Sequence, residues 1–393
     1  MGGVLQDVRV LDFGRYIAGP FAAALLGDFG ADVIRVERPE GGEDRILYPQ
    51  STTGDGATFM QSNRNKRGMT LDLKHPDAAE VLRRLIASAD VVVANLPQPT
   101  LVSLGLDYEA LCKIKPDIIL AAISAFGPTG PYAERVGFDG VAQCMSGAAY
   151  MTGFDGRPTR SFANWADMST AMLGAMGVLA ALRERDQTGR GQEVRGNLLK
   201  TAMTVLNAPL IEQSISKPNR APPGNRGIAG APVDIIRTKD GWIMVQVLGD
   251  APFRKWAKMI GEPHWVDDPR FADDNLRGDN GQAISERTEA WSKQYTTAEA
   301  LERLAQARLP AGPVLTLQQA LDDPHVAAAG FIQEVEFPGA ARPIPFVRPV
   351  ELSGHPNEIA LRPPLLGEHT QELLTELGFS AADIAALETS KAI

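Results

Sequence analysis

Short apolar runs alternate with amphipathic stretches along the first half of the chain. The apolar runs predict strands at residues 8–13, 33–37, 69–73, 91–93 and 118–123. Helices are predicted between them at 20–29, 76–87 and 108–113, and a longer helix from about 168 to 185 precedes a strand at 192–194. Parallel strands that helices cover on both faces read as continuous apolar runs. The pattern therefore predicts an α/β fold built on a parallel sheet.

The pattern changes after residue 213. Residues 214–231 are expected to form a linker, because Pro, Gly and Asn crowd its second half. The Asp240-Gly241 pair predicts a hairpin of strands 233–237 and 242–247. Amphipathic helices are expected near 253–260, 285–294 and 298–307. We thus expect a large domain at 1–213, a smaller α+β domain at 232–309, and a linker and tail at 310–393 that returns to the large domain and ends in a helix near 370–377.

Composition narrows the classes of function. The formal net charge of −9 argues against nucleic-acid binding, which needs a basic footprint. Two cysteines and five scattered histidines favour a reduced compartment and predict neither a disulfide framework nor a metal site. The N-terminus lacks the pattern of a signal peptide, and no window approaches the ~20 apolar residues of a membrane span. The expectation is a cytoplasmic protein that binds no membrane.

Asp167 is the first candidate for chemistry, because it stands just ahead of the long predicted helix. The simpler role is an N-cap, since aspartate accepts well from orphan amides. The functional role uses the same setting: the helix dipole holds the carboxylate ionised, and an ionised carboxylate can attack a thioester carbonyl. The sequence alone leaves both roles open.

Other candidates are weaker. Residues 63–67 with Lys74 form a basic stretch, which is either a solvated loop or a patch facing phosphates. The first β-α-β unit lacks the G-x-G-x-x-G turn, so a dinucleotide site with Glu37 as the ribose acid is rejected. No G-x-S-x-G elbow is present, and Cys144 is expected to be buried.

Taken together, several segments resemble family III CoA-transferases, to which formyl-CoA:oxalate and carnitine CoA-transferases belong. The segments are 11–13, 18–20, 30–39, 65–67, 71–74, 94–97, 137–140, 188–192 and 364–370. The resemblance spans nearly the whole chain. It implies a Rossmann-like large domain formed by both chain ends, and an interlocked-ring homodimer with the active site between large and small domains of different subunits.

The resemblance also implies an activity. Asp167 matches the family's nucleophile, which moves coenzyme A from an acyl-CoA donor to a small carboxylic acid through an aspartyl-CoA thioester. Nearby backbone amides would stabilise the oxyanions. Coenzyme A is then a substrate, and no cofactor is bound permanently. Arg15, Arg160 and Arg226 are candidates to hold a second carboxylate of a dicarboxylate substrate.

Contacts to coenzyme A carry over position by position. They are Ile17, Ala18, Arg38, Leu71, Asp72, Leu73, Lys74, Asn95, Leu96, Pro97, Arg135, Val136, Gly137 and Phe138. Two positions depart from the family pattern: Ser103 replaces a phosphate-binding arginine, and Ile17 replaces a glutamine near the pantetheine. The family's glycine-run lid is absent, and a loop containing Gly224, Asn225, Arg226 and Gly227 is expected to cover the site instead.

Two other functions are compatible with parts of the sequence. The α-methylacyl-CoA racemases share the fold but use a histidine where this chain has Phe138, which cannot act as a base. A non-catalytic CoA-binding protein would tolerate loss of Asp167, yet the chain keeps Arg38, Lys74 and Asp167 together. Both alternatives are therefore ranked below a transferase.

Overall fold

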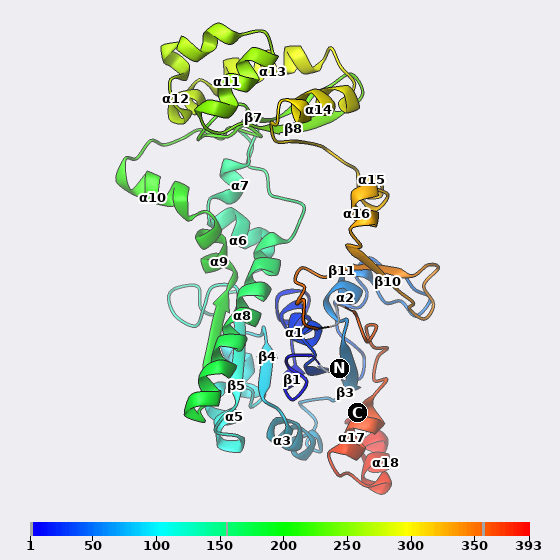
Figure 1. The fold of residues 1–393 in the computed structure, drawn as a ribbon. Helices are drawn as coiled ribbons and strands as arrows, with labels where there is room; N and C mark the ends of the chain where they lie inside the picture. Colours follow the sequence, from blue (N-terminus) through cyan, green and yellow to red (C-terminus); the bar gives the residue numbers. More distant parts are fainter. Residues whose placement is uncertain (1–2, 155, 356–357) are drawn as a thin grey trace. The chain divides into compact units, whose positions relative to one another are not determined.

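A six-stranded parallel sheet organises the larger part of the protein (Figure 1). The computed structural model describes residues 3–154, 156–355 and 358–393. The strand order is β3-β2-β1-β4-β5-β6, the order of a doubly wound sheet. The strands are β1 (Arg9–Asp12), β2 (Asp32–Glu37), β3 (Lys66–Thr70), β4 (Val91–Ala94), β5 (Ile119–Ser124) and β6 (Glu193–Asn197). The predicted α/β fold with a parallel sheet is confirmed.

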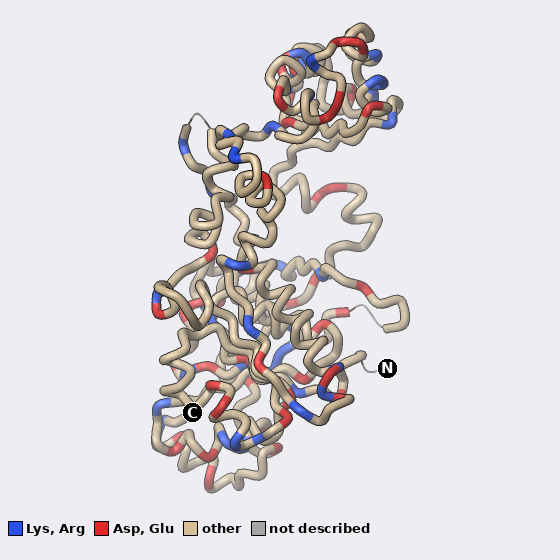
Figure 2. The backbone as a smooth tube through the Cα atoms, turned by 90° about the vertical axis from the view of Figure 1, so that its left-hand side faces the viewer, with Lys and Arg blue, Asp and Glu red and all other residues tan. Residues whose placement is uncertain are grey.

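The chain divides into two compact units. Unit 1 comprises Met1–Ser146, Ser161–Glu212 and Gly330–Ile393, and unit 2 comprises Gly147–Arg160 and Gln213–Ala329. Both chain ends thus belong to the unit that holds the parallel sheet. The domain limits expected at residues 213, 232 and 309 stay a prediction. Acidic and basic residues are interspersed along the chain (Figure 2).

Helices cover both faces of the sheet because successive side chains of a strand point to opposite faces. Val10 and Val91 join the core formed with α1 and α8, whereas Leu11 and Val92 join the core on the other face. The helices of unit 1 are α1 (Ala18–Asp28), α2 (Ala57–Ser62), α3 (Ala78–Ser88), α4 (Gln98–Ser103), α5 (Tyr108–Ile114), α6 (Asp139–Met145), α8 (Trp165–Thr188), α9 (Leu198–Val205), α17 (Thr370–Glu376) and α18 (Ala381–Ser390).

The C-terminal segment covers β3, the edge strand of the sheet. The N–H of Asn65 donates to the carbonyl of Leu361 at 2.8 Å, and the N–H of His369 donates to the carbonyl of Gly68 at 2.8 Å. α17 follows, at the predicted place, and packs on β3. Residues near the end of the chain therefore satisfy backbone groups that an edge strand would leave unpaired. A short hairpin of β10 (Ile332–Val335) and β11 (Ile344–Val347) precedes this segment.

Unit 2 is built on a small antiparallel sheet of order β7-β8-β9. The predicted hairpin is confirmed, with β7 (Val233–Arg237) paired to β8 (Trp242–Gln246). Phe253, Trp256 and Phe271 are fully buried in its aromatic core. The remaining elements are α7 (Ala148–Met151), β9 (Ala311–Pro313), α11 (Asp250–Met259), η1 (Pro263–Asp267), η2 (Pro269–Phe271), α12 (Asp274–Asp279), α13 (Gly281–Ser292), α14 (Thr297–Gln306), α15 (Leu317–Leu321) and α16 (Pro324–Ala328); α10 (Asn207–Ile215) crosses the limit between the units.

Helix α8 contradicts the expectation that no segment of the chain is long and apolar enough to span a membrane. Among the described residues it is the one helix long and apolar enough to cross a bilayer by length and composition. Ala171, Ala175 and Val178 of α8 are buried in the core shared with α1. A helix that is apolar because it fills a core passes the same test as a membrane span. Packing in unit 1 thus accounts for the buried part of the apolar composition of α8.

Candidate active site

A cavity of about 190 Å³ lies in unit 1, where the order of the sheet reverses between β1 and β4. In doubly wound sheets, ligands bind outside the carboxyl ends of the strands at this switch point. The loops after β1, β4 and β5 line the cavity, together with residues 135–138 and the side chain of Asp167. The sheet therefore places the candidate nucleophile at the position where this fold takes ligands.

Asp167 lies in the first turn of α8, and Asn164 occupies the N-cap position. The N-cap role considered for Asp167 is therefore wrong. The carboxylate that caps the helix comes from another element: Oδ2 of Asp139, on α6, accepts the N–H of Ala166 at 2.8 Å and the N–H of Asp167 at 3.0 Å. The side chain of Asp167 therefore does not cap the helix, and it lines the cavity.

The electrostatic setting of Asp167 also differs from the expectation. Burial, and secondly the like charge of Asp139, raise the pKa of Asp167 to about 7. The helix dipole was expected to keep this carboxylate ionised. The helix dipole does not keep Asp167 ionised, because the first N–H groups of α8 already bind the negatively charged side chain of Asp139. The pKa of Asp167 thus lies well above that of an ordinary aspartate, because burial and Asp139 both disfavour the ionised form.

The amides at the start of α8 are fully engaged. The N–H of Trp165 donates to the carbonyl of Ala163 at 2.9 Å, and the N–H of Met168 donates to the carbonyl of Asn164 at 3.0 Å. With the two N–H groups bound by Asp139, the N–H groups of residues 165–168 are all engaged. These amides cannot stabilise an oxyanion as they stand, so the expected donors must come from other groups around the cavity.

Sequence reasoning missed Asp139 and the residue that supports it. Asp139 is 3% exposed, and the amide of Gln143, one helical turn along α6, donates to its second carboxylate oxygen. The pairing joins two segments 27 and 28 residues apart, so local spacing carries no signal for it. The available clue was its place next to Phe138, in a segment that the resemblance had already singled out.

Asn95 joins the two loops at the switch point. Its Oδ1 accepts the N–H of Arg15 at 2.6 Å, and its Nδ2 donates to the carbonyl of Arg15 at 2.7 Å. The side-chain amide of Asn95 is thus held by a single residue of the loop after β1. Any direct contact of Asn95 with a ligand is additional to this role in shaping the cavity wall.

A second cavity of about 360 Å³ adjoins the first, since Arg15 and Leu96 line both. It is bordered by Arg38 and residues 71–74. The fourteen residues predicted to contact coenzyme A all line one cavity or the other. The expected substrate loop at 224–227 belongs to unit 2, where the guanidinium of Arg226 donates to the side chain of Gln282.

Three cationic side chains that could bind an anionic ligand line the second cavity: Arg15, Arg38 and Lys74. The guanidinium of Arg38, about half exposed, donates to the carbonyl of Gly41 at 2.7 Å and pairs with Glu43 at 3.3 Å. Glu43 also pairs with Arg15 at 2.6 Å. The ammonium of Lys74 has no ion-pair partner among the described residues. Ser103, at the position of the missing arginine, lines neither cavity and its hydroxyl donates to the carbonyl of Thr100 at 2.9 Å.

Neither interpretation of the basic stretch fits residues 63–67, whereas Lys74 borders the second cavity. Lys66 is fully buried, and its ammonium binds Oδ2 of Asp12 at 2.7 Å. Arg64 is buried against Asp28 at 2.6 Å, and Arg67 pairs with Asp32 at 2.8 Å. Lys66 and Arg64 face the interior because each finds a carboxylate there, which a buried charge requires. Arg67 instead binds the more exposed carboxylates of Asp32, Glu372 and Glu376. These three cations are therefore unavailable to a phosphate.

Asp12 ends β1 and is the centre of this buried network. Its Oδ1 accepts the N–H of Gly14 at 2.8 Å, and Arg35 approaches its Oδ2 at 3.5 Å while donating to the carbonyl of Gly14. Burial opposes ionisation, but Lys66 and Arg35 outweigh it and hold the pKa of Asp12 below its ordinary value. The network thus fixes the start of the loop that lines both cavities.

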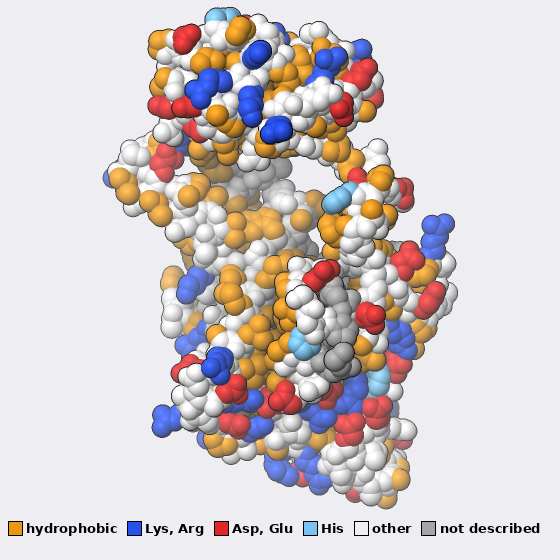
Figure 3. Space-filling model, in the orientation of Figure 1, with side chains coloured by type: hydrophobic (Ala, Val, Ile, Leu, Met, Phe, Trp, Pro, Cys, Tyr) orange, Lys and Arg blue, Asp and Glu red, His pale blue; other side chains and the backbone are white. Residues whose placement is uncertain are grey.

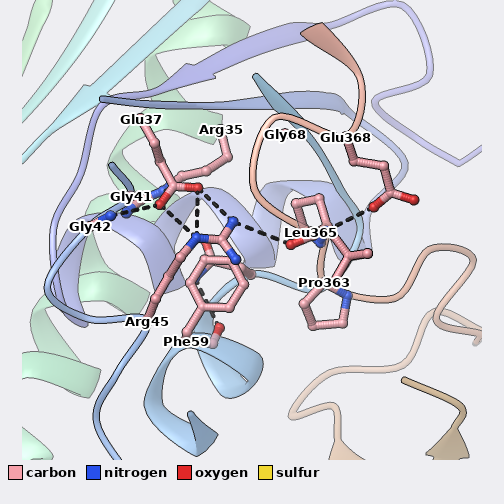
Figure 4. Close-up of polar contacts among 12 residues, drawn as sticks. Arg35, Glu37, Gly41, Gly42, Arg45, Phe59, Gly68, Pro363, Leu365 and Glu368 are labelled. Atoms are coloured by element: carbon pink, nitrogen blue, oxygen red, sulfur yellow. Dashed lines mark hydrogen bonds and ion pairs between the residues drawn. The ribbon is translucent and has the colours of Figure 1, made fainter. Parts of the chain in front are cut away.

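Glu37 belongs to a neighbouring buried pair, which Figure 4 shows. The guanidinium of Arg45 binds Glu37 at 2.7 Å and Asp55 at 2.6 Å, and it lies 3.8 Å above the ring of Phe59. Its other contact is the carbonyl of Pro364 at 3.3 Å, in the C-terminal segment. Glu37 is therefore held by Arg45 and borders the second cavity.

Two further sequence expectations can be compared with the structure. Cys144 is exposed and not buried as expected, because it lies on the outer side of α6. No group of three His, Cys, Asp or Glu side chains within the described residues could hold a metal ion.

Known proteins resemble this chain over nearly its whole length. Residues 5–370 match CoA-transferase family III. The chain is 36% identical to a formyl-CoA:oxalate CoA-transferase of Rhodopseudomonas palustris, covering 100% of this chain and 98% of the relative. It is 33% identical to a succinyl-CoA–D-citramalate CoA-transferase of Chloroflexus aurantiacus, covering 99% and 98%. It is 35% identical to the β subunit of a succinyl-CoA–L-malate CoA-transferase of the same organism, covering 99% and 98%.

Solved structures give the same result. A CAIB/BAIF family protein from Brucella suis superposes with a TM-score of 0.84 at 32% identity, over 96% of this chain and 100% of that one. Rv3272 from Mycobacterium tuberculosis superposes with a TM-score of 0.83 at 29% identity, over 95% and 99%. The matches extend over nearly the full length of each partner. This chain therefore belongs to CoA-transferase family III and is a CoA-transferase.

Proposed function

We propose that this enzyme moves coenzyme A from an acyl-CoA donor to a small carboxylic acid, with Asp167 as the covalent nucleophile. The observation that carries the proposal is the position of the Asp167 carboxyl in the wall of the first cavity, which adjoins a second cavity bordered by cationic side chains. The nucleotide end of coenzyme A would occupy the second cavity near Arg38 and Lys74. The pantetheine arm would then run past Ile17, Ala18 and Leu96 toward Asp167.

The first half-reaction begins with attack of an Asp167 oxygen on the carbonyl of the donor acyl-CoA. A C–O bond forms and the C–S bond breaks, giving a mixed anhydride and a coenzyme A thiolate. The thiolate then attacks the Asp167 carbonyl, forming a C–S bond and releasing the donor acid as its carboxylate. The enzyme now holds an aspartyl-CoA thioester.

The second half-reaction runs the same steps backwards with the acceptor. The acceptor carboxylate attacks the aspartyl thioester and releases the thiolate, which then attacks the acceptor carbonyl of the new anhydride. The products are the acceptor acyl-CoA and the free Asp167 carboxylate. No proton is gained or lost overall, so the enzyme needs an ionised Asp167 and no separate general base.

The test is Asp167→Ala, compared with Asp107→Ala at the start of α5 as a matched control. Asp107 is a helix-start aspartate whose side chain only caps, accepting the N–H of Ala110 at 3.3 Å. We expect Asp167→Ala to lose transfer by at least about 10³-fold while its Kd for coenzyme A changes little. Mass spectrometry of the wild type quenched with hydroxylamine during turnover should show Asp167 modified. Unchanged turnover in Asp167→Ala would falsify the assignment.

Substrate choice can be narrowed from the cavity wall and the relatives. The relatives' names pair formyl-CoA with oxalate and succinyl-CoA with D-citramalate or L-malate, so the acids include dicarboxylates. Of the three arginines considered for a second carboxylate, Arg15 lines the first cavity, whereas Arg160 and Arg226 belong to unit 2. A panel of these donors and acids, assayed with wild type and Arg15→Gln, should show a selective rise in KM for dicarboxylates.

We also propose that the enzyme acts as a homodimer in the cytoplasm. Support for a second copy comes from apolar side chains left exposed on packed helices α6, α8 and α9 of unit 1, a region where apolar atoms gather on the surface (Figure 3). Met172, Leu173 and Met176 of α8 are 44%, 44% and 61% exposed. Contiguous apolar surface of this kind usually marks an interface. Sedimentation equilibrium should give twice the 42.2 kDa chain mass, and a monomer at micromolar concentration would refute the dimer.

A further inference from the structure

Asp139 touches the candidate nucleophile only through the backbone. It is buried on α6, and its Oδ2 binds the N–H groups of Ala166 and Asp167 at 2.8 and 3.0 Å. It is not among the residues that line either cavity. A substrate in those cavities therefore meets Asp167 and not Asp139.

A second side chain of α6, that of Gln143, also binds the segment at the start of α8. The Nε2 of Gln143 donates to Oδ1 of Asp139 and to the carbonyl of Ala163 at 3.2 Å. The Oε1 of Gln143 accepts the N–H of Ser161 at 2.8 Å. Two neighbouring side chains of α6 thus hold the turn from Ser161 to Asp167, which precedes and opens α8.

We propose that Asp139 is the positioning residue for Asp167, and that its negative charge keeps the free Asp167 carboxylate in an unfavourable, reactive state. The proposal rests on the assignment of Asp167 as the nucleophile. It assigns Asp139 two effects that can be separated: the hydrogen bonds fix the direction of Asp167, and the charge opposes ionisation of its carboxyl group.

The charge effect follows from the neighbours of Asp167. The charged groups on the surrounding segments are Asp139 on α6 and the cavity residues Arg15 and Arg135. Arg15 is paired with Glu43, and the guanidinium of Arg135 lies 4.3 Å over the ring of Tyr132. Asp139 is the one charged residue that contacts the Asp167 backbone among the described residues, and its sign matches that of the ionised carboxylate.

Acylation removes this repulsion. An aspartyl anhydride or thioester carries no charge on the Asp167 side chain, whereas the free carboxylate does. Repulsion from Asp139 therefore raises the energy of the free carboxylate and leaves the covalent states untouched, which favours bond formation. The same repulsion raises the pKa of Asp167, so an ionised fraction is obtained only near neutral pH and above.

The experiment measures kcat/KM against pH for the wild type, Asp139→Asn and Asp139→Glu, because this quantity reports groups of the free enzyme. In the wild type, activity should fall below a midpoint near pH 7, where Asp167 becomes protonated. Asp139→Asn, which removes the charge, should move this midpoint down by about one pH unit or more. Asp139→Glu retains the charge and should leave the midpoint close to that of the wild type, although kcat falls.

Controls separate this effect from loss of structure. The amide introduced by Asp139→Asn faces the amide of Gln143, so a lower Tm is expected and is measured for each variant. Asp107→Ala, which removes the cap of α5, should lower Tm without moving the midpoint. A purely structural Asp139 would lower kcat in both Asp139 variants and move the midpoint in neither.

The outcomes also distinguish this proposal from the assignment of the nucleophile. If hydroxylamine never labels Asp167 in the wild type, the nucleophile is wrong. If Asp167 is labelled but the midpoint of Asp139→Asn equals that of the wild type, the role of Asp139 is overturned. Should that variant fail to fold, the wild type alone decides: a midpoint at an ordinary carboxyl value of about 4 overturns the proposal.

Discussion

The buried network around Asp12 permits a strong test, the substitution Asp12→Ala. The carboxylate binds Lys66 at 2.7 Å, Arg35 at 3.5 Å and the N–H of Gly14 at 2.8 Å, and it is fully buried. The substitution removes the negative charge between two buried cations. It also removes the acceptor that holds the loop lining both cavities.

The size of the effect follows from what the two cations retain. Breaking a buried ion pair by removing one partner costs about 3–5 kcal/mol, because a buried charge loses its compensation. Arg35 keeps Asp44 at 3.1 Å. Lys66 keeps the carbonyls of Pro20 at 2.7 Å and Ser62 at 2.8 Å. We therefore expect a loss near the lower end, about 3 kcal/mol of the free energy of unfolding.

The loss should depend on pH through Lys66. Burial lowers the pKa of Lys66 to about 8, although Asp12 acts in the opposite direction. Without Asp12 the pKa falls further, so the folded protein binds fewer protons than the unfolded chain, whose lysine has the ordinary value of 10.5. Stability of the variant must then rise with pH between these two values. The deficit relative to wild type should be smaller at pH 9 than at pH 6.

Urea denaturation followed by hydrogen exchange and mass spectrometry provides the assay. Peptides covering β1, β2 and β3 report on unit 1 alone, which matters because a chain with two units need not unfold in one step. Combining Asp12→Ala with Lys66→Met should restore part of the loss by removing one orphaned cation. Glu80→Ala, which breaks an exposed pair with Arg83 in the same unit, is the control and should change little.

Two results would refute this reasoning. If the free energy of unfolding falls by less than about 1 kcal/mol, water or rearrangement compensates the two cations, and the cost of leaving them buried was overestimated. A deficit that grows with pH would contradict the sign of the linkage. Either result would also remove the argument that this network fixes the loop after β1.

The remaining predictions concern single positions. Asp167→Asn should raise Tm at pH 8 and change it little at pH 4. The pKa of Asp167 is raised to about 7 from an ordinary 3.8, so its ionised form destabilises the folded state and the neutral amide does not. Equal shifts of Tm at both pH values would contradict this. Asn95→Ala should raise KM for acyl-CoA about tenfold with a smaller change in kcat, because the clamp on Arg15 is lost. Gly191→Ala should cost about 1–3 kcal/mol in urea titrations, because its Cβ would lie 1.9 Å from the carbonyl oxygen of Ile118.

The elements of the sheet could be predicted because their signals are local. Residues 91–93 and 118–123 are uninterrupted apolar runs, and both are central strands buried on two faces. The strand at Lys66–Thr70 was placed about three residues too late. Its first residues are charged, and the partner that permits their burial, Asp12, lies 54 residues earlier in the chain. Apolar patterning cannot register such a pairing.

The candidate site was predictable only where the residue itself carries the chemistry. Asp167 stands out as a carboxylate at the start of an apolar helix, and the resemblance supplied the positions that line the cavities. Its protonation state could not be predicted, since it depends on burial and on Asp139, which the fold brings from 28 residues away. The same limit applies to Asn95, whose clamp on Arg15 spans 80 residues.

The covering of β3 by the C-terminal segment has a consequence for biosynthesis. The N–H of Asp72 donates to the carbonyl of Ala392 at 2.8 Å, so a border of the second cavity is completed by the penultimate residue. A ribosome adding about 5–20 residues per second needs roughly 15–65 seconds to synthesise the intervening chain. During that time the nascent sheet exposes an unpaired edge, which invites association with other nascent chains. Removal of Ala392 would therefore leave the border of the second cavity incomplete, whereas removal of residues 361–370 would also open the sheet edge.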